Sequence, residues 1–216
     1  MFSLFDVIHF NSRITQQVYE KHLGRCDSSI IPITHAEIAD NRTKREFDNK
    51  ILKLIFIGGT TPYKGLPLLE KLLLKLYHQG IKNWSLDIWG SQGTSSCELI
   101  RYNGRYDHWQ LHEIYHHDSL LVVPSLWNET FSLVTLEALS YGIPVLLSGN
   151  VGAKDLVEDY DPWFVYQRES QLEEKIKELL VDRSKLRTFN TKIINSPWQH
   201  SLEQHTKAIL ELYKKI

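Results

Sequence analysis

Short apolar runs alternate with amphipathic stretches from residue 51 onward. The apolar runs have the length of strands, and several are apolar throughout, as strands buried on both faces are. The predicted strands are 51–57, 85–89, 99–102, 119–123, 143–147 and 163–166. The predicted helices are 65–79, 108–117, 131–141, 153–158 and 171–181. This alternation predicts an α/β fold, a Rossmann-like parallel sheet with helices on both faces.

The two ends of the chain depart from this alternation. Residues 11–23 predict a helix, and residues 30–33 predict a short extended piece. Residues 34–50 are polar and charged, which is typical of a linker, and residues 201–214 predict a closing helix. The sequence is therefore divided into an N-terminal part (1–33), a linker (34–50), a Rossmann-like domain (51–200) and a C-terminal helix (201–216).

Composition narrows the classes of protein to consider. The formal net charge is −1, so no global basic field recruits nucleic acid, and we expect no nucleic-acid partner. Cys26 and Cys97 are too few for a disulfide framework or a four-cysteine zinc site, which fits a reducing cytoplasm. No stretch approaches the ~20 apolar residues that cross a bilayer. The first residues lack a basic lead and reach Asp6 early, so they are a poor secretion signal. The expected location is cytoplasmic.

Two carboxylates, Glu129 and Glu137, lie eight residues apart between the predicted strand 119–123 and Gly142. Eight residues of α-helix rise about 12 Å and turn the side chain by only about 80°. Both carboxylates are therefore predicted on one side of a helix entrance. The helix N-terminus between them offers free N–H groups and a positive dipole end, which suit a phosphate. A nucleotide sugar carries hydroxyl groups on both sides of its diphosphate. Two carboxylates that accept hydrogen bonds from these hydroxyls, with an anion-binding helix N-terminus between them, would suit such a ligand.

The segment 124–139 resembles the Glu-x7-Glu signature of the retaining glycosyltransferases of family 4, which have the GT-B fold of two facing Rossmann-like domains. Three further segments are similar to the family in its order. They are 56–65 (its glycine turn and phosphate-contacting lysine), 86–93 (the next strand and its glycine loop) and 137–145 (the helix-to-strand return). The resemblance covers residues 50–160 and implies the C-terminal, donor-binding half of a GT-B fold.

The resemblance implies roles for individual residues. Glu137 would accept hydrogen bonds from the ribose hydroxyls of a nucleotide-sugar donor. Glu129 would face the donor sugar and Lys64 would contact the diphosphate, and these two are the predicted catalytic residues. The predicted donor-binding residues are Gly58, Gly59, Lys64, Gly90, Arg105, Tyr106, Glu129, Thr130, Phe131, Ser132, Leu133 and Glu137. Thr130 to Leu133 would contribute backbone N–H groups. No metal and no cofactor are implied.

The chain departs from the family pattern at three positions. The family has an arginine where this chain has Gly59, so one of two motif cations is missing. Weaker donor binding, compensation by Arg105 and loss of activity are all open. The family also has glycines where Thr130 and Ser132 stand, which predicts a stiffer loop.

The implied function is that of the donor-binding half of a retaining hexosyltransferase. It would move a sugar from a nucleotide-diphosphate sugar to a saccharide or lipid-linked acceptor, with peripheral contact at the inner face of the cell membrane left open. By the same resemblance, residues 1–33 are the tail end of an N-terminal acceptor domain and residues 201–216 are a helix that crosses back to it. An acceptor-domain polypeptide is then an expected partner.

Two other functions remain open. The missing arginine permits a non-catalytic nucleotide-sugar-binding module. His112, Glu113 and His116 match the His-Glu-x-x-His pattern of zinc hydrolases, which places two histidines on one helical face. That site needs a third ligand, and no glycine-and-histidine continuation follows His116.

Overall fold

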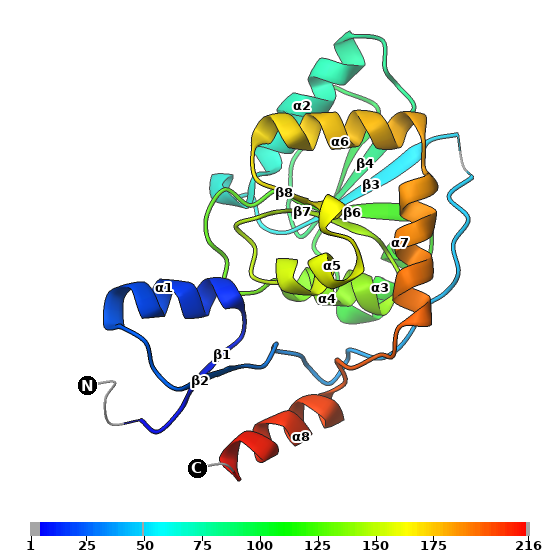
Figure 1. The fold of residues 1–216 in the computed structure, drawn as a ribbon. Helices are drawn as coiled ribbons and strands as arrows, with labels where there is room; N and C mark the ends of the chain where they lie inside the picture. Colours follow the sequence, from blue (N-terminus) through cyan, green and yellow to red (C-terminus); the bar gives the residue numbers. More distant parts are fainter. Residues whose placement is uncertain (1–4, 49, 215–216) are drawn as a thin grey trace.

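The computed structural model describes residues 5–48 and 50–214. The parts of the predicted segments 1–33, 34–50 and 201–216 that fall on residues 1–4, 49 and 215–216 lie outside the described residues. The centre of the fold is a parallel six-stranded sheet in the order β5-β4-β3-β6-β7-β8 (Figure 1). This confirms the predicted Rossmann-like sheet.

All six predicted strands are present, with ends that differ by two residues at most. They are β3 (Leu52–Ile57), β4 (Trp84–Trp89), β5 (Ile100–Gly104), β6 (Ser119–Val123), β7 (Val145–Ser148) and β8 (Val165–Tyr166). Every residue of β6 and β7 is buried, as their apolar sequences predict. β8 is shorter than predicted because Pro162–Phe164 forms a 3-10 turn.

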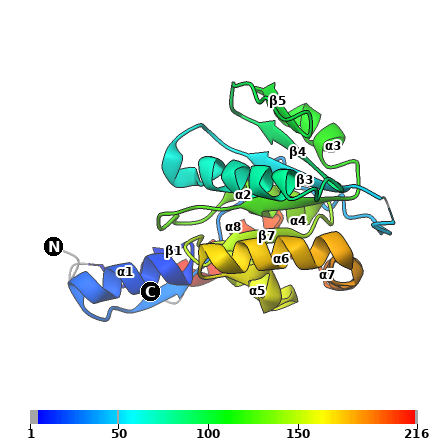
Figure 2. The same cartoon turned by 90° about the horizontal axis from the view of Figure 1, so that it is seen from above.

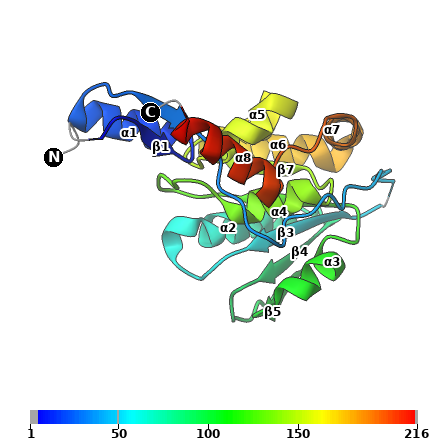
Figure 3. The same ribbon diagram turned by 90° about the horizontal axis from the view of Figure 1, so that it is seen from below.

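Helices cover both faces of the sheet. They are α2 (Leu66–His78), α3 (Leu111–Ile114), α4 (Leu133–Ser140), α5 (Lys154–Tyr160), α6 (Glu169–Val181) and α7 (Ser184–Asn195). Figure 2 shows α2 and α6 over one face, where the Lys75 ammonium of α2 lies 2.9 Å from the Glu173 carboxylate of α6. Figure 3 shows α3, α4 and α5 on the opposite face.

Two helices differ from the prediction. Residues 108–117 were predicted as one helix, but a 3-10 turn (His108–Gln110) leads into α3, which is a single turn. α7 was not predicted, although it buries Leu186, Phe189 and Ile193 at helical spacing. Most of its other positions are polar, so the apolar stripe is too narrow to stand out in the sequence.

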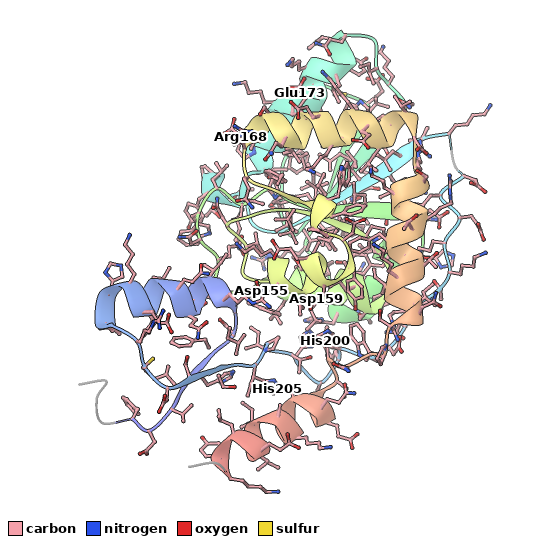
Figure 4. The ribbon with its side chains drawn as sticks, viewed as in Figure 1. Asp155, Asp159, Arg168, Glu173, His200 and His205 are labelled. Carbon is pink, nitrogen blue, oxygen red and sulfur yellow. The ribbon has the colours of Figure 1, made fainter. Side chains whose placement is uncertain are left out.

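The two ends of the chain form a small separate layer. β1 (Ile8–Phe10) and β2 (Ser28–Ile30) pair in parallel, and α1 (Arg13–Leu23) connects them. α8 (Leu202–Tyr213) lies near this unit (Figure 1). The Arg13 N–H donates to Asp155 of α5 at 2.9 Å, and a ring nitrogen of His205 on α8 lies 2.9 Å from the Pro32 carbonyl (Figure 4). The short strand β1 was not predicted. Among the described helices, none is both long and apolar enough to cross a bilayer.

The predicted linker is irregular but packs against the sheet domain. Its described residues form no helix or strand, yet Arg45 and Phe47 are buried. The Arg45 guanidinium donates to four backbone carbonyls, those of Tyr115, His116, His117 and Tyr141. These bonds satisfy its two terminal nitrogens and offset much of the cost of burying the charge, while its Nε has no partner among the described residues. The segment is therefore fixed to the domain, and the boundaries assigned around it stay a prediction.

Candidate functional site

The chain order of the sheet reverses between β3 and β6, and a cavity of about 290 Å³ lies at this point. In open parallel sheets, such a reversal leaves a crevice at the carboxyl ends of the strands. The ends of β3 and β6 and the start of α4 line the cavity, together with Gly58, Gly59, Lys64 and Glu129. The structure thus brings together residues of two loops that are far apart in the sequence, the one after β3 and the one between β6 and α4.

Lys64 and Glu129 form an ion pair in this cavity. The Lys64 Nζ lies 2.9 Å from the Glu129 Oε2, and the side chains are 36% and 11% exposed. Backbone hydrogen bonds hold Glu129 beside the turn that follows β7, because its N–H donates to the Asn150 carbonyl and its carbonyl accepts from the Gly152 N–H. The Glu129 Oε1 is buried without a hydrogen-bond partner among the described residues. This oxygen is available to a ligand hydroxyl.

The loop before α4 presents free backbone donors. The N–H groups of Thr130, Phe131, Ser132 and Leu133 donate no hydrogen bond to any described residue. Phe131 is buried, so its side chain fixes the loop on the core. α4 begins at Leu133, two residues later than predicted. The rise of about 12 Å and the turn of about 80° estimated for eight helical residues therefore do not apply, because an irregular loop covers the first half of the interval from Glu129 to Glu137.

The α1 end of the chain holds this loop in place. The Thr130 carbonyl accepts hydrogen bonds from the Ser12 hydroxyl at 2.6 Å and the Thr15 hydroxyl at 3.2 Å. A Cβ on Gly152 would lie 2.2 Å from the same carbonyl oxygen. Sequence reasoning missed these three residues. No local pattern links Ser12 to a loop that follows it by more than a hundred positions.

Glu137 lies outside the cavity, in a second part of the site. It is 4% exposed, and its Oε1 lies 3.5 Å from the His35 Nε2. Burial raises the pKa of this carboxyl above its ordinary value, and His35 and His108 act in the opposite direction. The Glu137 Oε2 is buried without a partner among the described residues. A buried carboxylate oxygen in this state is a strong acceptor for a ligand.

Tyr106 connects Glu137 to the end of β4. Its ring packs edge-on against Trp89 at 6.4 Å between centroids. Burial, followed by the nearby Glu137 carboxylate, raises the pKa of the Tyr106 hydroxyl to about 12. Arg105 is exposed, and no described residue forms an ion pair with it. The structure therefore brings Tyr106 to Glu137 and leaves Arg105 without contact to Lys64 or Glu129.

The glycine turns at the ends of β3 and β4 support each other. The Ser91 hydroxyl donates to the Gly58 carbonyl at 2.5 Å. Gly90 has φ +80°, and a Cβ there would lie 3.1 Å from the Gly58 oxygen. Gly59 is different, since a Cβ on it would meet no atom within 4 Å and its φ is not positive. The position where the family has an arginine is open to a side chain.

The His-Glu-x-x-His segment does not form a metal site. α3 ends at Ile114, before His116, and the rings of His112 and His116 are 5.9 Å apart. Within residues 5–48 and 50–214, the group of three metal-ligating side chains close enough to share an ion is His35, His108 and Glu137. Neither histidine of the predicted pair belongs to it.

The parallel sheet with helices on both faces and a cavity at its chain reversal defines an α/β domain of the Rossmann-like type. The family model described as glycosyl transferases group 1 matches residues 37–195, and the chain belongs to this family. A search of the curated proteins found no match.

Solved structures share the fold, which is the Rossmann-like half of a GT-B glycosyltransferase. Anabaena HepE in complex with UDP and glucose has a TM-score of 0.75 at 17% identity, covering 98% of this chain and 63% of that chain. The lipopolysaccharide outer core galactosyltransferase WaaB in its apo form has a TM-score of 0.76 at 17% identity, covering 99% and 63%. WaaG, a glycosyltransferase involved in lipopolysaccharide biosynthesis, has a TM-score of 0.70 at 15% identity, covering 93% and 60%. The chain thus spans less than two thirds of the length of each of these proteins.

Proposed function

We propose that the chain is the donor-binding half of a retaining glycosyltransferase that moves a hexose from a nucleotide-diphosphate sugar to a saccharide or lipid-linked acceptor. One observation carries the proposal. Glu129 and Glu137 each have a buried oxygen without a partner among the described residues, one on either side of a loop of free N–H groups. Lys64 adds a positive charge at the same place. Two hydroxyl acceptors flanking a cationic, amide-rich cradle match a diphosphate with a sugar at each end.

The proposed donor occupies two parts of the site. The cavity of about 290 Å³ is at the small end of ligand sites, so it takes the sugar and the diphosphate. The nucleoside then extends past α4 to Glu137 and Tyr106. Anabaena HepE, which shares the fold, binds UDP and UDP-glucose in its solved complexes, and this supports a nucleoside diphosphate as the ligand class.

The mechanism follows from the groups around the cavity. Lys64 and the N–H groups of residues 130–133 stabilise the negative charge of the leaving diphosphate. The bond between the anomeric carbon and the diphosphate oxygen breaks, and the acceptor oxygen forms its bond on the same face. The acceptor proton passes to the departing diphosphate oxygen. Glu129 orients the sugar through its free oxygen, and its other oxygen positions Lys64. No step in this scheme requires a metal or a cofactor.

The remaining assignments depend on the same proposal. Residues 1–33 and 201–216 are proposed as the tail end of an acceptor domain and a helix crossing to it. An acceptor-domain polypeptide is then the proposed partner, and the proposed location is the cytoplasm or the inner face of the cell membrane.

A non-catalytic nucleotide-sugar-binding module is a second candidate function, favoured by Gly59 alone. The zinc hydrolase is disfavoured, because His112 and His116 lack a third ligand among the described residues.

Transfer of a labelled sugar separates these candidates. The chain is joined to the acceptor domain of a group 1 glycosyltransferase and supplied with labelled nucleotide sugars and that domain's acceptor. The proposal predicts transfer that disappears in Lys64→Ala. Donor binding without any transfer, in a fusion whose acceptor domain still binds its acceptor, would favour the binding module instead.

Replacing Gly59 with arginine is expected to tighten binding of a nucleoside diphosphate by about 10-fold. The position is open and has no positive φ, so the side chain enters without strain. A charge-assisted hydrogen bond to phosphate contributes about 1.5–3 kcal/mol, less the cost of ordering the side chain. Titration calorimetry measures the gain. Gly59→Gln is the control, because it adds a polar side chain without charge at the same position, and equal affinity in both variants would contradict the prediction.

Replacing Glu137 with glutamine is expected to stabilise the free protein and weaken donor binding together. Burial of the ionised carboxylate opposes folding, so its neutral isostere should raise Tm by about 2–4 °C for a gain near 1 kcal/mol. The same change removes the charged acceptor for the ribose. Thermal unfolding with and without ligand measures both effects. Glu113→Gln, at an exposed position, should change neither, and a lower Tm for Glu137→Gln would refute the argument.

A further inference from the structure

We propose that His35, His108 and Glu137 form a binding site for one divalent transition-metal ion, with Zn²⁺ as the expected ion. Three separate parts of the fold contribute these ligands. His35 comes from the irregular segment before β3, His108 from the 3-10 turn after β5, and Glu137 from α4. Two imidazole nitrogens and one carboxylate oxygen are a ligand set typical of zinc.

The distances are close to those of a bound ion. One ligand atom from each of the three residues lies within 4.8 Å of the other two. Tetrahedral zinc with bonds of about 2.0–2.1 Å places its ligand atoms roughly 3.3 Å apart. The His35 Nε2 and the Glu137 Oε1, at 3.5 Å, already have this separation. The His108 side chain is 53% exposed and so has the freedom to close the remaining gap.

Two buried polar atoms in this group have no hydrogen-bond partner among the described residues. They are the Glu137 Oε2 and the His35 Nε2. A carboxylate that is 4% exposed is costly to keep ionised without a hydrogen bond or a cation. A metal ion bound by the His35 Nε2 and the Glu137 Oε1 would give the histidine nitrogen a partner and place a positive charge beside the buried carboxylate. This pair of unsatisfied atoms is an observation independent of the spacing of the ligands.

Glu37 contacts both histidines, and at His108 it supplies the outer acceptor that metal-binding histidines usually have. Its Oε2 lies 2.9 Å from the His108 Nδ1, which orients the ring and leaves Nε2 for the ion. The His35 Nδ1 accepts a long 3.3 Å hydrogen bond from the Glu37 N–H. Neutral His35 therefore carries its proton on Nε2 in the free protein. Binding an ion through Nε2 moves that proton to Nδ1 and exchanges this contact for the metal bond.

The ion would compete with a nucleotide. Glu137 is the residue that the proposed function assigns to the ribose, so metal and donor share one carboxylate. This competition rests on the proposed function, whereas metal binding itself does not. None of its three ligands lines the cavity that holds Lys64 and Glu129, and the ion takes no part in sugar transfer. Its consequence would be inhibition of donor binding.

Titration calorimetry of Zn²⁺ into untagged, metal-stripped protein tests the site. The expected result is saturable one-to-one binding that weakens at least 100-fold in His35→Ala and in His108→Ala. Glu37→Gln should weaken it by about 10-fold, as loss of an outer contact does. The matched control is the double variant His112→Ala with His116→Ala, which should bind as the unaltered chain does. Binding lost in that double variant, binding unchanged in His35→Ala, or no saturable binding would each overturn the proposal.

Cobalt gives a second readout that a change in folding cannot imitate. Four-coordinate Co²⁺ absorbs visible light strongly, and this absorption should appear in the unaltered chain and be absent in His35→Ala. UDP is then titrated with and without Zn²⁺. Weaker UDP binding with Zn²⁺ in the unaltered chain, but not in His35→Ala, is the expected competition. Zinc binding without binding of UDP, GDP, ADP or TDP would refute the proposed function alone, and binding of one of these diphosphates without zinc binding would refute the metal site alone.

Discussion

Replacing Lys64 with alanine is expected to weaken binding of a nucleoside diphosphate by about 100-fold. Lys64 is the cation of the described cavity, and its Nζ lies 2.9 Å from the Glu129 Oε2. A charge-assisted hydrogen bond to phosphate contributes about 1.5–3 kcal/mol, and every 1.4 kcal/mol is a factor of ten in affinity. The substitution also leaves the nearly buried Glu129 carboxylate unpaired beside an anionic ligand. Titration calorimetry with the diphosphate that the unaltered chain binds most tightly measures the loss.

Two further variants make this result specific. Lys71→Ala removes an exposed lysine from α2, and it should leave affinity unchanged within about twofold. The double variant Lys64→Ala with Glu129→Gln should bind more tightly than Lys64→Ala alone, because it removes the unpaired charge. With Glu129→Gln alone as the fourth protein, the double-mutant cycle isolates the interaction between the two side chains. Similar losses in Lys64→Ala and Lys71→Ala would mean that Lys64 is an ordinary surface charge.

Replacing Gly65 with alanine is expected to destabilise the protein by about 3 kcal/mol or more. Gly65 has φ +81°, and its Cβ would lie 1.8 Å from the Pro124 carbonyl oxygen and 2.6 Å from the Pro124 carbonyl carbon. Positive φ alone costs roughly 1–2 kcal/mol in a residue with a Cβ, and a backbone clash adds to that. Because Gly65 links Lys64 to α2 and Pro124 begins the loop to Glu129, the change should also separate the ion pair. Urea unfolding measures the loss of stability.

Gly80 supplies the matched control for this prediction. It has the same φ of +81°, but a Cβ there would meet no atom within 4 Å. Gly80→Ala should therefore show the cost of positive φ alone, about 1–2 kcal/mol. The difference between the two variants measures the close approach of Gly65 to Pro124. Equal destabilisation would show that this close approach contributes nothing.

The sheet was predictable because its strands are short apolar runs bounded by glycine, proline or polar residues. Ser119–Val123 was predicted at its observed ends, since all five residues are buried and a proline follows. α7 was missed because only a narrow stripe of it, including Leu186 and Phe189, faces the core. The helix at 108–117 was predicted too long. Its amphipathic pattern continues past Ile114, where the hydrogen bonds of the helix end.

The site was predictable where its residues directly follow the ends of predicted strands. Gly58, Lys64 and Glu129 follow the ends of neighbouring parallel strands, so the sequence could place them at one edge of the sheet. The ion pair between Lys64 and Glu129 was not predicted, because side-chain pairing depends on loop conformation. His35 and Ser12 were missed for another reason. They lie far from α4 and Thr130 in sequence, and only the packed fold brings them there.

Thermal unfolding in the presence of UDP, GDP, ADP, TDP and their sugars tests the central claim most directly. The unaltered chain is compared with Glu137→Gln and with Glu113→Gln as a matched control. A ligand at 100 times its dissociation constant stabilises a protein by about 2.7 kcal/mol, which is a clear shift in Tm. We predict selective stabilisation by one nucleoside diphosphate and its sugar, kept in Glu113→Gln and lost in Glu137→Gln. No stabilisation by any of these ligands at millimolar concentration, or equal stabilisation of all three proteins, would contradict the proposed donor site.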